Sequence, residues 1–142
     1  GRKLGADFAV DTAVEDAVEA VRRRFTDGAD RVIVTSPPKS MEQAIATGRF
    51  GVTVSFIGIN LGGNSSIAVD VNDLIFNKRS LVPTFAEPAI KFPASLKILQ
   101  KGMMDARQII THTFKLGEHE TIFRGIVDGR EPIIKAVCTP NG

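Results

Sequence analysis

The chain has little of the chemistry that builds covalent or metal-linked structure. Cys138 is the only cysteine among 142 residues, which excludes an internal disulfide and a zinc site built from thiolates. Apolar runs are short, and the longest, such as residues 52–59, fall far below the roughly 20 residues of a membrane-spanning helix. A net charge of +2 is too small to indicate nucleic acid or a membrane surface as a partner. Residues 1–7 lack a signal-peptide core, so we expect a cytoplasmic protein.

Motifs of several enzyme classes are missing as well. The sequence has no Gly-x-Ser-x-Gly elbow, Walker loop, His-Glu-x-x-His or Cys-x-x-Cys, so hydrolase, nucleotidase and metalloprotease hypotheses have no residues to rest on. It also has no glycine-rich phosphate loop, although the alternation of its segments is typical of a nucleotide-binding fold. We therefore expect the sequence to begin partway through a domain.

What is present is the composition of a globular chain, with 43% hydrophobic and 24% charged residues, and a length that fits one ordinary domain. Helices are predicted at residues 12–25, 41–47, 92–100 and 118–128, the first from a capping box formed by Thr12 and Glu15. Strands are predicted at residues 7–11, 31–35, 52–59, 67–69, 81–85 and 132–137. Because the segments at 31–35 and 52–59 are mostly apolar and flank a helix, they indicate a parallel α/β sheet. Pro83 cannot donate to a ladder and marks an edge or strand-end position.

Six segments resemble one family in their order and spacing: LGADFAVD, DRVIVTS, RFGVTVSFIG, KRSLVPTFAEP, ITHTFKL and IIKAVCTP. From residue 4 to residue 140 the chain resembles the C-terminal part of the medium-chain, zinc-type alcohol and polyol dehydrogenases. The resemblance implies a partial doubly wound, Rossmann-like parallel sheet with flanking helices over residues 1–115. It implies that residues 116–142 are a tail whose helix and strand return to the catalytic domain. That domain, its zinc ligands and the glycine fingerprint would precede residue 1.

The same resemblance implies the cofactor contacts that this segment would contribute. They would line the nicotinamide side of an NAD or NADP crevice at the carboxyl ends of the strands, and they are Thr35, Ser36, Ile57, Gly58, Ile59, Thr84, Phe85 and Lys135. Gly58 would let the backbone approach the ribose or nicotinamide, and Lys135 would reach the pyrophosphate. Two positions depart from the family pattern: Val52 and Pro83 stand where glycine is usual. No catalytic residue and no metal ligand is assigned to this chain.

Each of these positions also has a simpler structural interpretation. Thr35, Ser36 and Gly58 are residues that end strands in most α/β proteins, and Lys135 could be a solvated residue of an edge strand. His112 and His119 are both near glutamates, but they are separated by a predicted strand-to-helix junction, so we do not expect them to converge on a metal. The sequence Asn64-Ser65-Ser66 fits a glycosylation acceptor, yet nothing in the sequence indicates secretion.

The leading hypothesis is a segment of an NAD(P)-dependent dehydrogenase that transfers hydride between a small alcohol or polyol and nicotinamide. Zinc would belong to the parent protein only, and this chain alone would be inactive and bind the cofactor weakly or not at all. The alternative is a non-catalytic α/β interaction module derived from a dehydrogenase. By resemblance, the strand at residues 81–85 pairs across a two-fold axis, so a homo-oligomer is expected, whereas the strand at residues 31–35 would have an unpaired edge.

Overall fold

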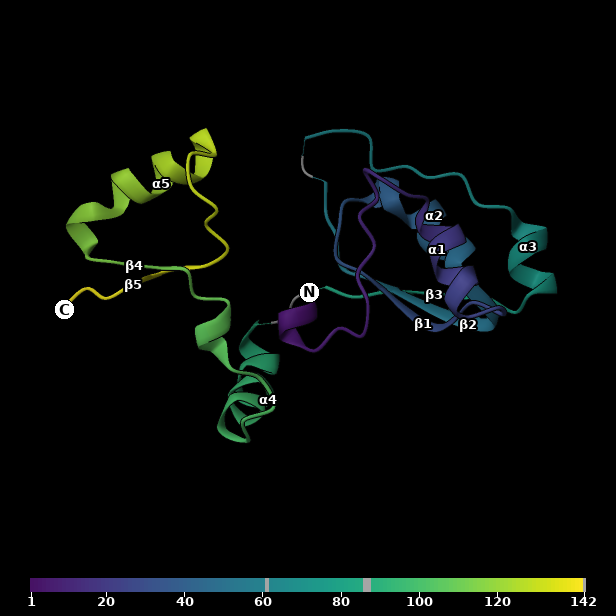
Figure 1. Ribbon diagram of the computed structural model, residues 1–142, viewed down its shortest axis with the longest axis horizontal. Coiled ribbons are helices and arrows are strands. Elements are labelled where there is room, and N and C mark those ends of the chain that lie inside the picture. Colours follow the sequence, from purple (N-terminus) through teal and green to yellow (C-terminus); the bar gives the residue numbers. More distant parts are fainter. Residues whose placement is uncertain (61, 86–87, 142) are drawn as a thin grey trace. The chain divides into compact units, whose positions relative to one another are not determined.

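A computed structural model describes residues 1–60, 62–85 and 88–141 (Figure 1). The chain divides into two compact units, Gly1–Glu87 and Pro88–Gly142, called unit 1 and unit 2 below. Among the described residues, no helix combines the length and apolar character that crossing a membrane would require. Each unit is described by itself.

Unit 1 is built on a parallel sheet of the strands β1 (Ala29–Val34), β2 (Gly48–Phe56) and β3 (Ser80–Pro83), in the order β1-β2-β3. The strands end in register, since Val34 lies opposite Phe56 and Phe56 opposite Pro83. Helix α2 (Met41–Thr47) joins β1 to β2 after a short 3-10 turn at Pro38–Ser40, and helix α3 (Val71–Phe76) precedes β3. The prediction of parallel strands around the helix at 41–47 is confirmed.

The core of unit 1 lies between this sheet and α2. Alternate residues of a strand face the same side of a sheet, and on this side Val34, Val52 and Val54 are buried together with Met41 and Ile45 of α2. Helix α1 (Ala17–Arg24) packs on α2, and Figure 1 shows both helices on the same side of the sheet. On the opposite side, Ile33 of β1 is 76% exposed.

Three expectations for unit 1 are wrong. Residues 7–11 form no strand, because a strand needs a partner and the described sheet has none beside them. The first helix begins at Ala17 and not near Thr12, because the Asp16 carboxylate accepts the Glu19 amide at 2.9 Å and is the N-cap. The carboxylate of Glu15 instead pairs with Arg23.

Residues 67–69 are also not a strand, although Ile67 and Val69 pack against the core. Helix α3, which follows them, was not predicted. The Asp70 carboxylate caps it by accepting the amides of Asn72 and Asp73. Pro83 does end an edge strand, as predicted.

Unit 2 contains helix α4 (Pro88–Gln100), helix α5 (His119–Asp128) and two short parallel strands, β4 (His112–Phe114) and β5 (Ala136–Cys138). Both helices were predicted, while the last strand is shorter than the expected 132–137. Gly129 ends α5 with φ 62°, the left-handed conformation that favours glycine. None of the described residues of unit 2 is buried.

Candidate functional site

The candidate site lies where the three strands of unit 1 end. The Ile57 amide donates to the Val34 carbonyl at 3.0 Å, and the Thr84 amide donates to the Phe56 carbonyl at 2.8 Å, so the pairing continues one residue past each strand. The segments that follow β1, β2 and β3 therefore leave the sheet side by side. Parallel sheets of this class bind ligands at the carboxyl ends of their strands. We call these segments, residues 35–37, 57–59 and 84–85, the crevice segments.

The segments after β1 and β2 approach each other closely at Gly58. A Cβ atom placed on Gly58 would lie 1.9 Å from the carbonyl oxygen of Ser36 and 2.8 Å from the carbon of that carbonyl. No side chain fits at this distance, so the absence of one lets the two backbones touch.

Ser36 is held from its other side by helix α2. Its hydroxyl pairs with the hydroxyl of Ser40, which is the residue before the first turn of α2. The Ser40 hydroxyl and amide in turn both lie within hydrogen-bond distance of the Pro37 carbonyl, at 2.9 and 3.1 Å. The segment after β1 is thus fixed between α2 and Gly58.

A mainly apolar cavity of about 200 Å³ adjoins the crevice segments. Its walls include Ser36 and Gly58, the strand residues Val34 and Phe56, and Met41 of α2. Because the walls combine the crevice residues Ser36 and Gly58 with residues of the core, packing in the core and the position of the crevice segments are coupled.

The predicted cofactor residues lie in three different places in the structure. Thr35, Ser36, Ile57, Gly58 and Thr84 lie at one edge of the sheet. Ile59 and Phe85 follow in the same crevice segments, with exposed fractions of 57% and 72%. Lys135 lies in unit 2, directly before β5, where its carbonyl accepts the amides of Thr111 and His112 at 3.0 and 3.2 Å.

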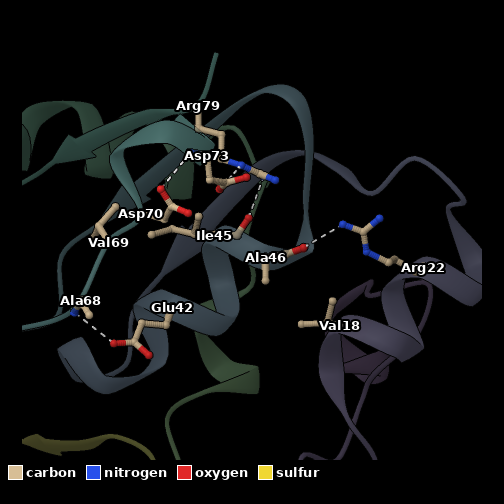
Figure 2. A pocket seen from close by; sticks show the side chains of 10 residues that line it. All are labelled: Val18, Arg22, Glu42, Ile45, Ala46, Ala68, Val69, Asp70, Asp73 and Arg79. Atoms are coloured by element: carbon tan, nitrogen blue, oxygen red, sulfur yellow. Dashed lines mark hydrogen bonds and ion pairs between the residues drawn. The ribbon is translucent and has the colours of Figure 1, made fainter. Parts of the chain in front are cut away.

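A second, larger pocket of about 490 Å³ lies beside α2, away from the crevice segments, and Figure 2 shows the side chains that line it. Its polar groups are already used within the fold. Arg22 donates to the Ala46 carbonyl at 3.2 Å, and Glu42 accepts the Ala68 amide at 3.1 Å. Asp70 caps α3. The pocket therefore presents little free polar chemistry to a ligand.

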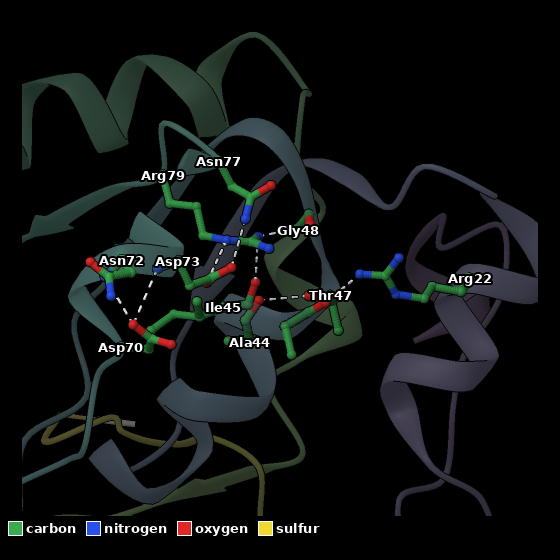
Figure 3. Close-up of polar contacts among 11 residues, drawn as sticks. Arg22, Ala44, Ile45, Thr47, Gly48, Asp70, Asn72, Asp73, Asn77 and Arg79 are labelled. Carbon is green, nitrogen blue, oxygen red and sulfur yellow. Dashed lines mark hydrogen bonds and ion pairs between the residues drawn. The ribbon is translucent and has the colours of Figure 1, made fainter. Parts of the chain in front are cut away.

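Arg79 is the polar residue of unit 1 that sequence analysis missed. Its side chain is 8% exposed, and Nη1 donates to the carbonyls of Ile45 and Gly48, both at 2.9 Å (Figure 3). Nε lies 2.8 Å from Asp73 Oδ2, an ionic contact without hydrogen-bond geometry. Arg79 thereby ties β3 and α3 to the end of α2. Arginine followed by a predicted strand is normally solvated, so the sequence carries no signal for this role.

The histidines of unit 2 make polar contacts within that unit. His112 Nε2 lies 3.0 Å from Glu131 Oε2, and its Nδ1 lies 2.9 Å from the Thr111 hydroxyl. His119 Nδ1 lies 2.8 Å from the Leu116 carbonyl. Within residues 1–60, 62–85 and 88–141, no three His, Cys, Asp or Glu side chains come together as metal ligands would.

The parallel sheet with helices packed on it and the side-by-side strand ends define a Rossmann-like α/β protein. The sequence matches the zinc-binding dehydrogenase family over residues 1–101, and the chain belongs to this family. It is 34% identical over 135 residues to an alcohol dehydrogenase of Rhizobium meliloti and 27% identical over 142 residues to the D-arabitol-phosphate dehydrogenase of Enterococcus avium. These matches cover 90% and 99% of this chain but only 37% and 39% of the two relatives.

Solved structures show the same fold. A zinc-binding dehydrogenase of Sinorhizobium meliloti 1021 with bound NADP superposes with a TM-score of 0.81 at 20% identity, over 98% of this chain and 41% of that one. The alcohol dehydrogenase of Thermus sp. ATN1 gives 0.80 at 18% identity, over 91% and 37%. The predicted α/β fold and the resemblance to part of a zinc-type alcohol dehydrogenase are confirmed.

Proposed function

We propose that this chain is the part of an NAD(P)-dependent alcohol or polyol dehydrogenase that forms the nicotinamide side of the cofactor crevice. The observation that carries the proposal is the alignment of three strand ends in one sheet, which brings Thr35, Ser36, Ile57, Gly58 and Thr84 to a single edge. Backbone carbonyls, amides and hydroxyls at such an edge are suited to an uncharged ring carboxamide and a ribose. Ile59, Phe85 and Lys135 complete the proposed set.

In the complete enzyme the bound nicotinamide would accept or deliver a hydride. The role of this chain is to hold that ring in one orientation and to exclude water around it, which is how protein residues contribute in cofactor enzymes. Zinc is proposed for the parent alone, because Cys138 is the only cysteine and the described residues hold no ligand cluster. We also propose that residues 1–115 belong to the dinucleotide-binding domain and residues 116–142 to the tail that returns to the catalytic domain. A cytoplasmic location and a dimer formed through β3 are further proposals.

The test must take into account that this chain matches only part of each relative. Since the chain spans about two fifths of the relatives' length, the isolated chain offers few of the cofactor contacts, and calorimetric titration with NADH or NADPH should show no saturation. A complete subunit, made by joining the preceding part of the Rhizobium meliloti enzyme to this chain, should bind one of the two with saturation. Micromolar binding by the isolated chain would contradict the first expectation.

Failure of the joined, folded subunit to bind either cofactor would contradict the crevice role. It would favour the alternative of a non-catalytic α/β interaction module derived from a dehydrogenase. Elemental analysis belongs to the same experiment: zinc should be present in the joined subunit and far below one per molecule in the isolated chain.

A further inference from the structure

Gly58 can be a glycine for two different reasons. In the proposed function it leaves room for the cofactor, in which case a side chain would harm only the complex. The structure supplies another reason, because a Cβ at this position would lie 1.9 Å from the Ser36 carbonyl oxygen. Outside their own residue and its chain neighbours, real Cβ atoms essentially never come within 3.0 Å of a heavy atom, and here the obstacle is backbone, which cannot rotate away as a side chain can.

The backbone conformation of Gly58 does not explain the glycine. Five other glycines have positive φ values, at Gly5, Gly28, Gly51, Gly102 and Gly129, but Gly58 is not one of them. Any residue could adopt its conformation, so the requirement is for space alone. That space is taken by Ser36.

Nor can Ser36 easily move aside. Its hydroxyl pairs with that of Ser40, and Ser40 also binds the Pro37 carbonyl through its hydroxyl and its amide. A side chain on Gly58 would therefore press against a segment that is held from behind by the start of α2. The strain would fall on the pairing between the strand ends, where the Ile57 amide donates to Val34.

We propose that Gly58 is a positioning residue, which sets the spacing of the crevice segments after β1 and β2 through its direct contact with the Ser36 backbone. Ser40 supports this contact from the α2 side. The inference rests on the proposed function only for what the crevice binds, and the contact exists in the protein without cofactor. Ser36 acts here through its carbonyl, and its hydroxyl is already committed to Ser40.

The decisive test is amide hydrogen exchange by NMR on the 142-residue chain without cofactor. Gly58→Ala should speed exchange of the Ile57 amide by roughly tenfold or more, as expected for overpacking against backbone, and should shift the amide signals of residues 35–40. Gly62→Ala is the matched control, because a Cβ there meets nothing within 4 Å and Gly62 has no positive φ. Unchanged exchange and unchanged signals in Gly58→Ala would overturn the proposal.

A milder variant covers the case in which Gly58→Ala does not fold. Ser40→Ala removes one hydroxyl and adds no atom, and it should speed Ile57 exchange about two- to threefold, the effect of one exposed hydrogen-bonded contact. The outcome against the proposal is that Ser40→Ala changes neither the amide signals of residues 35–37 nor the exchange rate of the Ile57 amide. In that case Ser40 does not support the contact between Gly58 and Ser36.

The joined subunit then tests the consequence for the cofactor. Both variants should raise the KM for the cofactor, Gly58→Ala more than Ser40→Ala, because each displaces the segments that would hold the cofactor. A higher KM in Gly58→Ala without any change in the cofactor-free chain would mean that the methyl group obstructs the cofactor directly, against positioning. If the unsubstituted subunit binds no cofactor, the proposed function fails, while the exchange data still decide whether Gly58 positions the crevice segments.

Discussion

Unit 1 and unit 2 use their apolar residues in opposite ways. In unit 1, Val52 and Val54 are 0% exposed and sit in one cluster with Met41 and Ile45. In unit 2, Phe123 and Val127 of α5 are 61% and 84% exposed. A helix with an apolar stripe is stable when that stripe is covered. Unit 1 thus carries its own core, whereas none of the described residues of unit 2 is buried.

The family explains why such a difference can exist within one chain. The relatives are more than twice as long as the part that matches, and under the proposed function the remaining part of such a subunit would cover the apolar face of α5. Under the same proposal that part would also cover the exposed Ile33 on the open side of the unit 1 sheet, because parallel sheets are normally covered on both faces. The comparison of the two units then predicts which parts of the chain can stand alone.

Separating the units gives the largest expected effect. A fragment of residues 1–87 should unfold cooperatively in urea, because it keeps its buried cluster. A fragment of residues 88–142 should show no cooperative transition, since none of its described residues is buried even in the whole chain. Circular dichroism and dispersion of amide NMR signals measure both. Cooperative unfolding of the second fragment would show that unit 2 also has a stable core, against the difference between the two units.

The next largest effect is the difference in stability lost when a buried ionic contact of unit 1 or an exposed ion pair of unit 2 is removed. Arg79→Met should lower the free energy of unfolding by about 2–4 kcal/mol, because it leaves Asp73 and two carbonyls without their buried cation. Arg124→Met removes a pair with Glu120 whose side chains are 74% and 68% exposed, and should cost less than about 0.5 kcal/mol. Urea denaturation of the whole chain compares them. Equal effects would show that Arg79 is not an anchor.

A third comparison uses valines alone. Val54→Ala deletes two buried methyl groups and should cost about 2–3 kcal/mol, whereas Val127→Ala, at an 84% exposed position, should lie within about 0.5 kcal/mol of zero. The same substitution thus reports burial in each unit. If Val127→Ala is as costly as Val54→Ala in the isolated chain, the surface of α5 must be covered, for example by a second copy, and light scattering would detect that copy.

Sequence patterns predicted the central elements because local and global signals agree there. The apolar residues of β1 and β2, the prolines before α2 and Pro83 at the end of β3 each favour the structure that they adopt. Where two local signals compete, prediction failed: Thr12 and Asp16 are both good caps, and the second one begins the helix. Helix α3 was missed because it is short and partly polar, although Asp70 before it is a strong capping residue.

For the site, the strand ends were predictable and the contacts between them were not. Residues after neighbouring parallel strands must emerge at one edge, which follows from the pattern alone. The contact of Gly58 with Ser36 joins residues 22 positions apart through the spacing of two loops, a distance that sequence does not encode locally. Arg79 was missed for a related reason, since its partners are backbone carbonyls of Ile45 and Gly48, which every residue possesses.

The smallest expected effect tests whether the exposed turn at Ala106–Gln108 is coupled to helix α5 within unit 2. Asp105 accepts from the Arg107 amide at 3.1 Å and from Arg107 Nε at 2.9 Å, and these hydrogen bonds, the side-chain one foremost, lower the pKa of Asp105 below its ordinary value. A carboxyl whose pKa is lowered by folding contributes stability that is fully present above its ordinary value, near 4, and is lost as the pH falls through the lowered one.

Because both residues are exposed and only two positions apart, that contribution should be confined to the turn at Ala106–Gln108. An NMR titration should show the pKa of Asp105 rising toward its ordinary value in Arg107→Gln. At each pH between 5 and 2, the signals of α5 should be the same in this variant as in the unsubstituted chain. Exchange of the α5 amides serves as the control for cooperativity. If protonating Asp105 loosened α5 as well, the two would belong to one cooperative structure, and the contrast between a unit with a core and a unit without one would have to be given up.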